Sequence, residues 1–168
     1  MKNNLPLIAI AATLVLFSCQ TPSNNANNNT MDKEKIKSEI IQTENELLET
    51  YRQGDFLKAL TIEVESPDFR AIVNGRIDNY STLSERYKKV ATDKLVRSMD
   101  YQIESQDFNF INADNVLVTL KVKLVTTMSD GNVSSKPLAE TILWQRIDNK
   151  WKLGHYHATE IPIDKLSN

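Results

Sequence analysis

The 168-residue chain contains one cysteine, two histidines and four glycines, and its charged residues nearly balance. With Cys19 as the single cysteine, no disulfide can form within the chain. The 20 basic and 22 acidic residues leave a formal net charge of −2 and form no basic stripe, so no nucleic-acid partner is predicted. The chain lacks a glycine-rich phosphate loop, a CxxC motif and a Ser-His-Asp order. The sequence therefore shows no motif for nucleotide binding or nucleophilic catalysis, and no cofactor is predicted.

An uncharged apolar run at residues 5–17 follows Lys2 and has the length of a signal-peptide core. It is too short to span a bilayer core of about 30 Å. The run ends in Leu16-Phe17-Ser18-Cys19, which resembles a bacterial lipobox. The resemblance implies a signal peptide at residues 1–18, cleavage before Cys19 and lipid attached to its thiol, so that the membrane becomes a partner. An ordinary secretion signal with an incidental cysteine is the alternative.

The polar stretch QTPSNNANNNT follows at residues 20–30 and has no large aliphatic residue. Such a segment cannot bury enough apolar surface to fold, so residues 19–31 are predicted to be a lipidated cysteine with a flexible tether. A folded domain is predicted at residues 32–168. Gln20 after the cysteine favours the outer membrane of the bacterial cell envelope over the inner one.

A helical period begins at Asp32, with apolar residues on one face up to Gly54, which is typical of a helix end. Asp55 is expected to cap a short second helix that Pro67 ends. Residues 69–75 predict a short strand with an Asn-Gly turn, and residues 80–95 return to helical spacing.

From residue 98 the apolar pattern has the two-residue period of strands. A change of phase within residues 98–111 predicts a bulge near residues 105–107. Residues 115–128 alternate cleanly, Asp130-Gly131 predicts a hairpin, and strands follow at 138–147 and 151–160. Helices followed by a long antiparallel meander predict an α+β fold with helices on one face of the sheet.

The stretch ETILWQRIDNKWKLGHYHATE, residues 140–160, resembles the association domain of calcium/calmodulin-dependent kinase II. The shared pattern is a Glu-Thr-x-x-Trp run, a Trp after an Asp turn and a His-aromatic-His run: Glu140, Thr141, Trp144, Asp148, Trp151, His155, Tyr156 and His157. With the order of elements, it resembles the nuclear transport factor 2-like superfamily and its SnoaL-like members. The resemblance implies a cone-shaped, cystatin-like roll, in which a curved antiparallel sheet wraps around the N-terminal helices, often open at one end as a pocket.

The resemblance also implies where chemistry would lie. Two arginines at the cone mouth of the association domain bind carboxylates, and these positions are Ile142 and Ala158 here, so that clamp is absent. The isomerases of the superfamily need a tyrosine and two carboxyl groups facing one cavity. Tyr51, Asp68 and Asp100 have the right types, but Tyr51 does not have the isomerase spacing from the helix-end glycine. No catalytic residue is carried over.

His155 and His157 would point the same way on an unbroken strand, together with Trp151 and Leu153. A metal site needs at least three protein ligands, no third histidine exists, and Glu160 has the opposite parity, so no metal is predicted. The histidines are expected in a packed wall. A binding or acid–base role and a metal site are the alternatives.

The function that these observations favour is a lipid-anchored, non-catalytic binding or association module, whose cone takes a small apolar ligand. A small cofactor-independent enzyme of the isomerase or dehydratase type, or a structural dimer with a filled cone, is the alternative. Apolar residues on both faces of 138–147 favour a homodimer. The expected pocket-lining residues are Tyr51, Tyr101, Ile142, Trp144, His155, Tyr156, His157 and Ala158.

Overall fold

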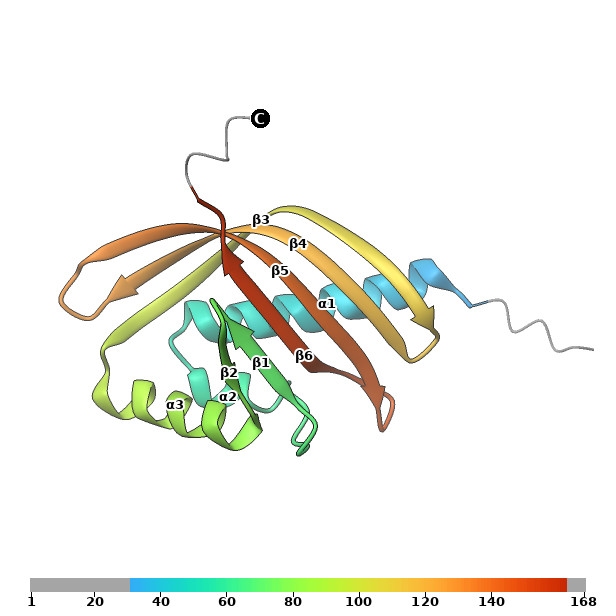
Figure 1. Cartoon of the computed structure of the whole chain (residues 1–168), viewed down its shortest axis with the longest axis horizontal. Helices are drawn as coiled ribbons and strands as arrows, with labels where there is room; N and C mark the ends of the chain where they lie inside the picture. Colours follow the sequence, from blue (N-terminus) through green and yellow to red (C-terminus); the bar gives the residue numbers. More distant parts are fainter. Residues whose placement is uncertain (1–30, 163–168) are drawn as a thin grey trace, which may run out of the picture. The chain divides into compact units, whose positions relative to one another are not determined.

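Helices pack against a six-stranded sheet in the computed structural model, which describes residues 31–162 (Figure 1). The predicted signal peptide, Cys19 with its predicted lipid, and all but the last residue of the predicted tether lie outside the described residues. No helix of the described part is long and apolar enough to cross a bilayer. The elements are α1 (Lys33–Arg52), α2 (Phe56–Ala59), β1 (Arg70–Val73), β2 (Arg76–Asp78), α3 (Tyr80–Asp93), β3 (Val96–Asn112), β4 (Asn115–Met128), β5 (Val133–Ile147) and β6 (Lys150–Glu160).

Aspartates start both predicted N-terminal helices. The Asp32 carboxylate accepts a hydrogen bond from the Lys35 backbone N–H at 3.0 Å, and Asp55 does the same for Lys58. Helix α1 ends just before Gly54, whose φ of +71° brings its backbone against the Arg97 carbonyl, where a Cβ would lie only 2.4 Å away. Helix α2 ends at Ala59, well before Pro67, so the second helix is shorter than predicted.

The strand order is β2-β1-β6-β5-β4-β3, and the meander from β3 to β6 is antiparallel, as predicted. Strand β1 pairs parallel to β6, so the complete sheet is mixed and not purely antiparallel. The register of β3 against β4 shifts between Ile103 and Ser105, at the near end of the predicted bulge region. Strand β5 begins at Val133, five residues before the predicted start.

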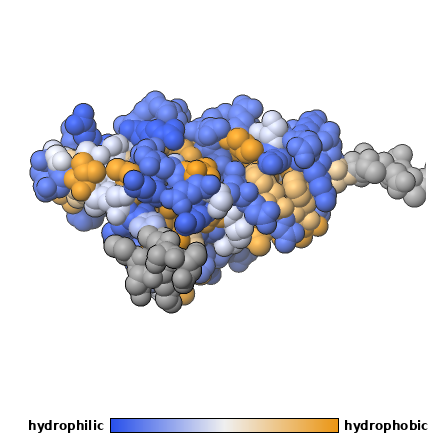
Figure 2. All heavy atoms as spheres, turned by 90° about the horizontal axis from the view of Figure 1, so that it is seen from above, coloured by the Kyte–Doolittle hydropathy of each residue, from blue (hydrophilic) through white to orange (hydrophobic). Residues whose placement is uncertain are grey.

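The sheet curves over α1, while α2, α3 and the β1–β2 hairpin lie at one end of its concave side (Figure 1). Alternation along β4 points Val116, Val118 and Val122 into the core, with at most 1 % of each residue exposed, and leaves Lys121 and Lys123 outside. Full burial of such a side chain stabilises the fold by about 1.5–3 kcal/mol. The face in Figure 2 is mainly hydrophilic, with small hydrophobic spots and one broader, paler hydrophobic area towards the right.

Candidate ligand-binding cavity

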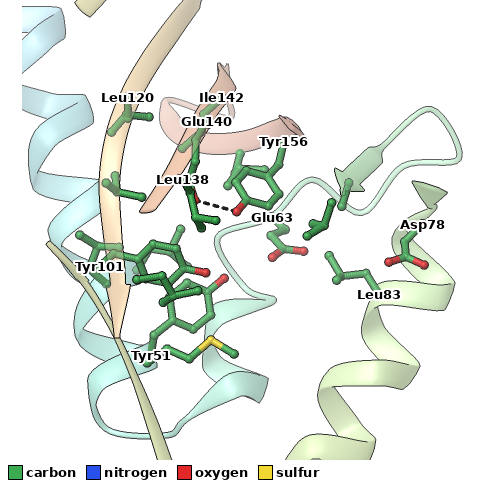
Figure 3. A pocket seen from close by; sticks show the side chains of 18 of the residues that line it. Tyr51, Glu63, Asp78, Leu83, Tyr101, Leu120, Leu138, Glu140, Ile142 and Tyr156 are labelled. Carbon is green, nitrogen blue, oxygen red and sulfur yellow. Dashed lines mark hydrogen bonds between the residues drawn. The ribbon is translucent and has the colours of Figure 1, made fainter. Parts of the chain in front are cut away.

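A cavity of about 250 Å³ lies between the concave face of the sheet and the three helices (Figure 3). Most of its wall is apolar and comes from α1, α2, α3 and all six strands. Helical spacing places Leu47, Leu48 and Tyr51 of α1 on the cavity side, and strand alternation does the same for Leu138 and Ile142 of β5. The cone is therefore not filled by its own side chains.

Four tyrosines bring hydroxyl groups to this apolar space: Tyr51, Tyr87, Tyr101 and Tyr156. The hydroxyls of Tyr51 and Tyr87 lie 2.8 Å apart, which joins α1 to α3 by a hydrogen bond. The rings of Tyr51 and Tyr101 are 5.5 Å apart between centroids. Burial raises the pKa of all four phenols, so that each stays a neutral hydroxyl that can donate or accept.

Glu140 of β5 is buried in the cavity wall and accepts a hydrogen bond from the Tyr156 hydroxyl at 2.9 Å (Figure 3). Burial raises the pKa of the Glu140 carboxyl to about 7, because the charged form loses its hydration. The Tyr156 hydrogen bond lowers this pKa, and the nearby Glu44 carboxyl raises it by repulsion. A carboxyl of this kind exchanges its proton near neutral pH.

Glu63 follows α2 and forms a second buried acid, 5 % exposed, on the helical side of the cavity. An isolated bridge to Leu153 of β6 holds its backbone in place. Burial raises the pKa of its carboxyl to about 7, although the neighbouring Tyr87 hydroxyl favours the charged form. Its Oε2 atom is buried and makes no hydrogen bond to any described residue.

Unpartnered buried polar atoms gather around this cavity. Among the described residues, five buried side-chain nitrogen or oxygen atoms have no hydrogen-bond partner. Four of them belong to residues of the cavity wall: Glu44 Oε1, Glu63 Oε2, Arg86 Nε and Trp144 Nε1. Leaving such a group unpaired costs about 1–3 kcal/mol, so the residues around this cavity hold four buried polar atoms without the hydrogen bonds that usually compensate burial.

Charged residues line the cavity beside the β1–β2 hairpin. The buried Asp78 carboxylate accepts from Arg86 at 2.7 Å and from Arg76 Nε at 3.2 Å. Lys136 of β5 binds Glu160 at the end of β6, and the Asn74 side chain donates to the same carboxylate at 3.2 Å. This part of the wall thus holds three cationic and two anionic side chains.

Five of the expected pocket residues line the cavity: Tyr51, Tyr101, Ile142, Trp144 and Tyr156. The other three, His155, His157 and Ala158, are absent from its wall. Ala158 is buried but small, whereas His155 is half-buried and His157 is exposed. The expected packed wall around both histidines is therefore wrong for His157.

A bulge at Gly154 explains the position of the histidines. Leu143 pairs with His155, but Trp144 pairs with Leu153, so Gly154 is the extra residue in β6. The bulge reverses the parity: Leu153 faces inward before it and Tyr156 after it, which turns the histidines outward. A Cβ on residue 154 would lie 2.0 Å from the Gln145 Oε1 atom, so glycine also makes room for that side chain.

Asp68 and Asp100, the two carboxylates of the type that the isomerases use, do not reach the cavity. Asp100 binds Arg52 at 2.7 Å on the surface, and Asp68 is exposed. The acids that do reach the cavity are Glu63 and Glu140, and neither of them was predicted from the sequence as a pocket residue. For Glu140 a signal existed, since it has the same parity as Leu138 and Ile142 in an otherwise apolar series. Glu63 lies in an irregular segment whose pattern carries no such signal.

No group of three or more His, Cys, Asp or Glu side chains within residues 31–162 is arranged to hold a metal ion. The polar groups of the cavity are carboxyls and phenols that can exchange or share protons. Their arrangement fits hydrogen bonding and proton transfer to a small organic molecule.

Comparison with solved structures places this architecture among known ones. A nuclear transport factor 2-like superfamily protein from Salmonella enterica superimposes with a TM-score of 0.67 at 14% identity, over 80% of this chain and 97% of that one. A protein from Streptomyces avermitilis, provisionally named a dehydratase of the same family, gives 0.66 at 12% identity, over 77% and 99%. A type 2 hexachlorocyclohexane dehydrochlorinase gives 0.63 at 14% identity, over 78% and 88%.

No model of a known protein family matches the sequence, and no curated protein matches it. The structural neighbours include named enzymes as well as proteins of unknown function, so the likeness carries the architecture and not an activity. The chain has the nuclear transport factor 2-like α+β cone fold.

Proposed function

We propose that this protein binds a small, largely apolar molecule with one or two polar groups in its cone cavity. The observation that carries the proposal is an apolar cavity surrounded by residues that hold four unpartnered buried polar atoms. A filled structural cone would leave no such cavity. The polar atoms include both donors and acceptors, so they suit a ligand that offers both.

The size of the cavity limits the ligand. An apolar cavity of about 150 Å³ holds one benzene molecule, so about 250 Å³ takes a body of roughly eight to ten carbon atoms. Trp144 is fully buried in the wall and reports on such a molecule by its fluorescence.

The binding test is a calorimetric titration of the described domain with octan-1-ol and with 2-naphthol, followed in parallel by tryptophan fluorescence. We expect saturable one-to-one binding and a rise in melting temperature. Val122→Trp, which fills part of the cavity from β4, should weaken binding while leaving the circular dichroism spectrum unchanged. Absence of binding by every probe of this size would refute the proposal.

A second candidate is proton-transfer catalysis on the bound molecule, and Glu63 favours it. Its buried carboxyl has an oxygen without a partner and a pKa of about 7, as a group that accepts and returns a proton needs. Glu63→Gln should then abolish turnover of a substrate but preserve its binding. If the protein only binds its ligand, Glu63→Gln would change the ligand affinity and there would be no turnover to lose. This difference separates the binding function from the catalytic one.

We also propose that lipid on Cys19 holds the protein in the bacterial cell envelope, at the outer membrane. Support comes from the lipobox-like Leu16–Cys19 and the polar stretch behind it. In cells fed a labelled fatty acid, Cys19→Ser should lose the label and retain the uncleaved N-terminal segment. Equal labelling and fractionation of the two forms would refute the anchor.

Finally, we propose that two copies pair through the outer face of the sheet. Thr119, Thr141, His157 and Ile72 form one uncharged row across four strands, and the half-buried Leu143 lies in the neighbouring row. Sedimentation equilibrium at micromolar concentration should give a dimer that Leu143→Glu dissociates. A monomer at all concentrations would leave that face as an ordinary surface.

A further inference from the structure

The charges of the cavity are distributed unevenly. The buried part of the wall carries the carboxyl groups of Glu44, Glu63 and Glu140, and none of the three forms a salt bridge with a described residue. Beside the β1–β2 hairpin, the wall carries Arg76 and Arg86. A ligand anion is repelled by the first region and attracted by the second.

The two arginines have binding capacity to spare. Both bind the single Asp78 carboxylate, which leaves this cluster with a net charge of about +1. Arg86 uses one terminal nitrogen for Asp78, and its buried Nε has no partner among the described residues. Arg76 uses Nε, and its side chain is 54% exposed. Since a guanidinium has five N–H donors in a planar fork, several remain for a second carboxylate.

Solvent exposure marks this region as the mouth. Asn74 and Arg76 on the hairpin and Lys136 on β5 are exposed, although they line the same cavity as the fully buried Trp144. In Figure 3, Asp78 and Leu83 lie at one side of the cavity, with Glu63 between them and the tyrosines. A ligand that enters here keeps one end beside the arginines and moves its other end towards Tyr101 and Tyr156.

We propose that the ligand is a small amphipathic acid, with its apolar body among the tyrosines and its carboxylate at the mouth, bound by Arg86 and Arg76. This inference rests on the proposed binding function and adds the chemical class and orientation of the ligand. The carboxylate pairs with the terminal N–H groups of the two arginines that Asp78 leaves free. The buried glutamates oppose the reverse orientation, because they would meet a second negative charge.

The test compares three probes with the same eight-carbon body, octanoate, octan-1-ol and octylammonium, by calorimetry at about pH 8, where octanoate is fully charged. Octanoate should bind about tenfold more tightly than octan-1-ol, since charge-assisted hydrogen bonds are roughly twice as strong as neutral ones. Octylammonium should bind more weakly than either. Added salt should weaken octanoate binding and leave octan-1-ol binding unchanged.

Two variants change the mouth in opposite directions. Arg76→Gln removes a half-exposed donor while Arg86 still binds Asp78, so octanoate should bind several-fold more weakly and octan-1-ol as before. Asp78→Asn frees both arginines and should strengthen octanoate binding alone. Arg52→Gln is the matched control, because Arg52 pairs with Asp100 outside the cavity and should change neither affinity.

Each outcome decides between the proposals. If octan-1-ol binds as tightly as octanoate in the wild type and Arg76→Gln leaves both affinities unchanged, the headgroup assignment is overturned and the cavity remains a binding site for neutral molecules. If octylammonium binds best, the charge argument is wrong. If none of the probes binds, the proposed binding function falls with it. Should Asp78→Asn not fold, Arg76→Gln still decides.

Discussion

Replacing Glu140 by Gln should make the stability of this protein less dependent on pH. The carboxyl has an ordinary pKa of 4.5 and a pKa of about 7 in the fold, mainly because it is buried. Between these values the folded chain holds a proton that the unfolded chain has lost. Stability contributed by this group is therefore present below about pH 4.5 and is lost as the pH rises to about 7.

The magnitude follows from the two pKa values. One pKa unit corresponds to about 1.4 kcal/mol, so the rise from 4.5 to about 7 corresponds to a loss of about 3 kcal/mol on going from acid to alkaline solution. Glutamine stays neutral at every pH and can still accept the Tyr156 hydrogen bond through its amide oxygen. Glu140→Gln should thus equal the wild type at about pH 4 and exceed its unfolding free energy by up to about 3 kcal/mol at about pH 8.

Urea unfolding followed by tryptophan fluorescence, repeated over this pH range, measures the difference. Glu63 titrates in both proteins and cancels in the comparison. Glu85→Gln on the exposed face of α3 shows what the loss of one surface charge does by itself. A difference between Glu140→Gln and the wild type that stays constant with pH would show that burial does not hold the Glu140 proton, and the reasoning on the cavity acids would fail.

Three further predictions concern stability. At concentrations too low for the proposed dimer, His157→Ala should change the unfolding free energy by less than about 0.5 kcal/mol in urea, because the side chain is exposed in the single chain; a loss above about 2 kcal/mol there would show that the chain itself covers this side chain. Gly154→Ala should lower the melting temperature by forcing the Gln145 side chain away, and Gln145→Ala should restore most of it; no rescue would place the strain in the backbone. Glu39→Ala should cost about 1–3 kcal/mol in urea unfolding, since one carboxylate accepts from Arg146 at 2.8 Å and from Trp151 at 3.0 Å; an effect near zero would mean that this contact between α1 and the sheet is dispensable.

Local chemistry made most of the elements predictable. The cap at Asp55, the Asn-Gly turn before β2 and the alternation along β4 all act over a few residues, and the structure has each of them. The parallel pairing of β1 with β6 joins segments far apart in the chain, so no local pattern announces it. The resemblance of the last hairpin supplied the fold class, which the comparisons support.

The cavity was harder to predict than the fold. One bulge at Gly154 reversed the inward parity of β6, so the rule that placed both histidines beside Trp151 and Leu153 failed within three residues. The acid–phenol wall is assembled from elements that are distant in sequence. Its least predictable member, Glu63, owes its position to a single bridge in an irregular segment.

The parallel pairing of β1 with β6 also determines when the protein can fold. Arg70 pairs with His155, 85 residues later, and β6 lies between the β1–β2 hairpin and the rest of the meander. Until β6 has been synthesised, no strand connects the β1–β2 hairpin to the rest of the meander. Pairing β1 with β6 also closes a long loop of chain, which costs entropy. The complete six-stranded sheet therefore cannot form before β6 has been synthesised, even if the hairpin and the earlier strands of the meander have already folded.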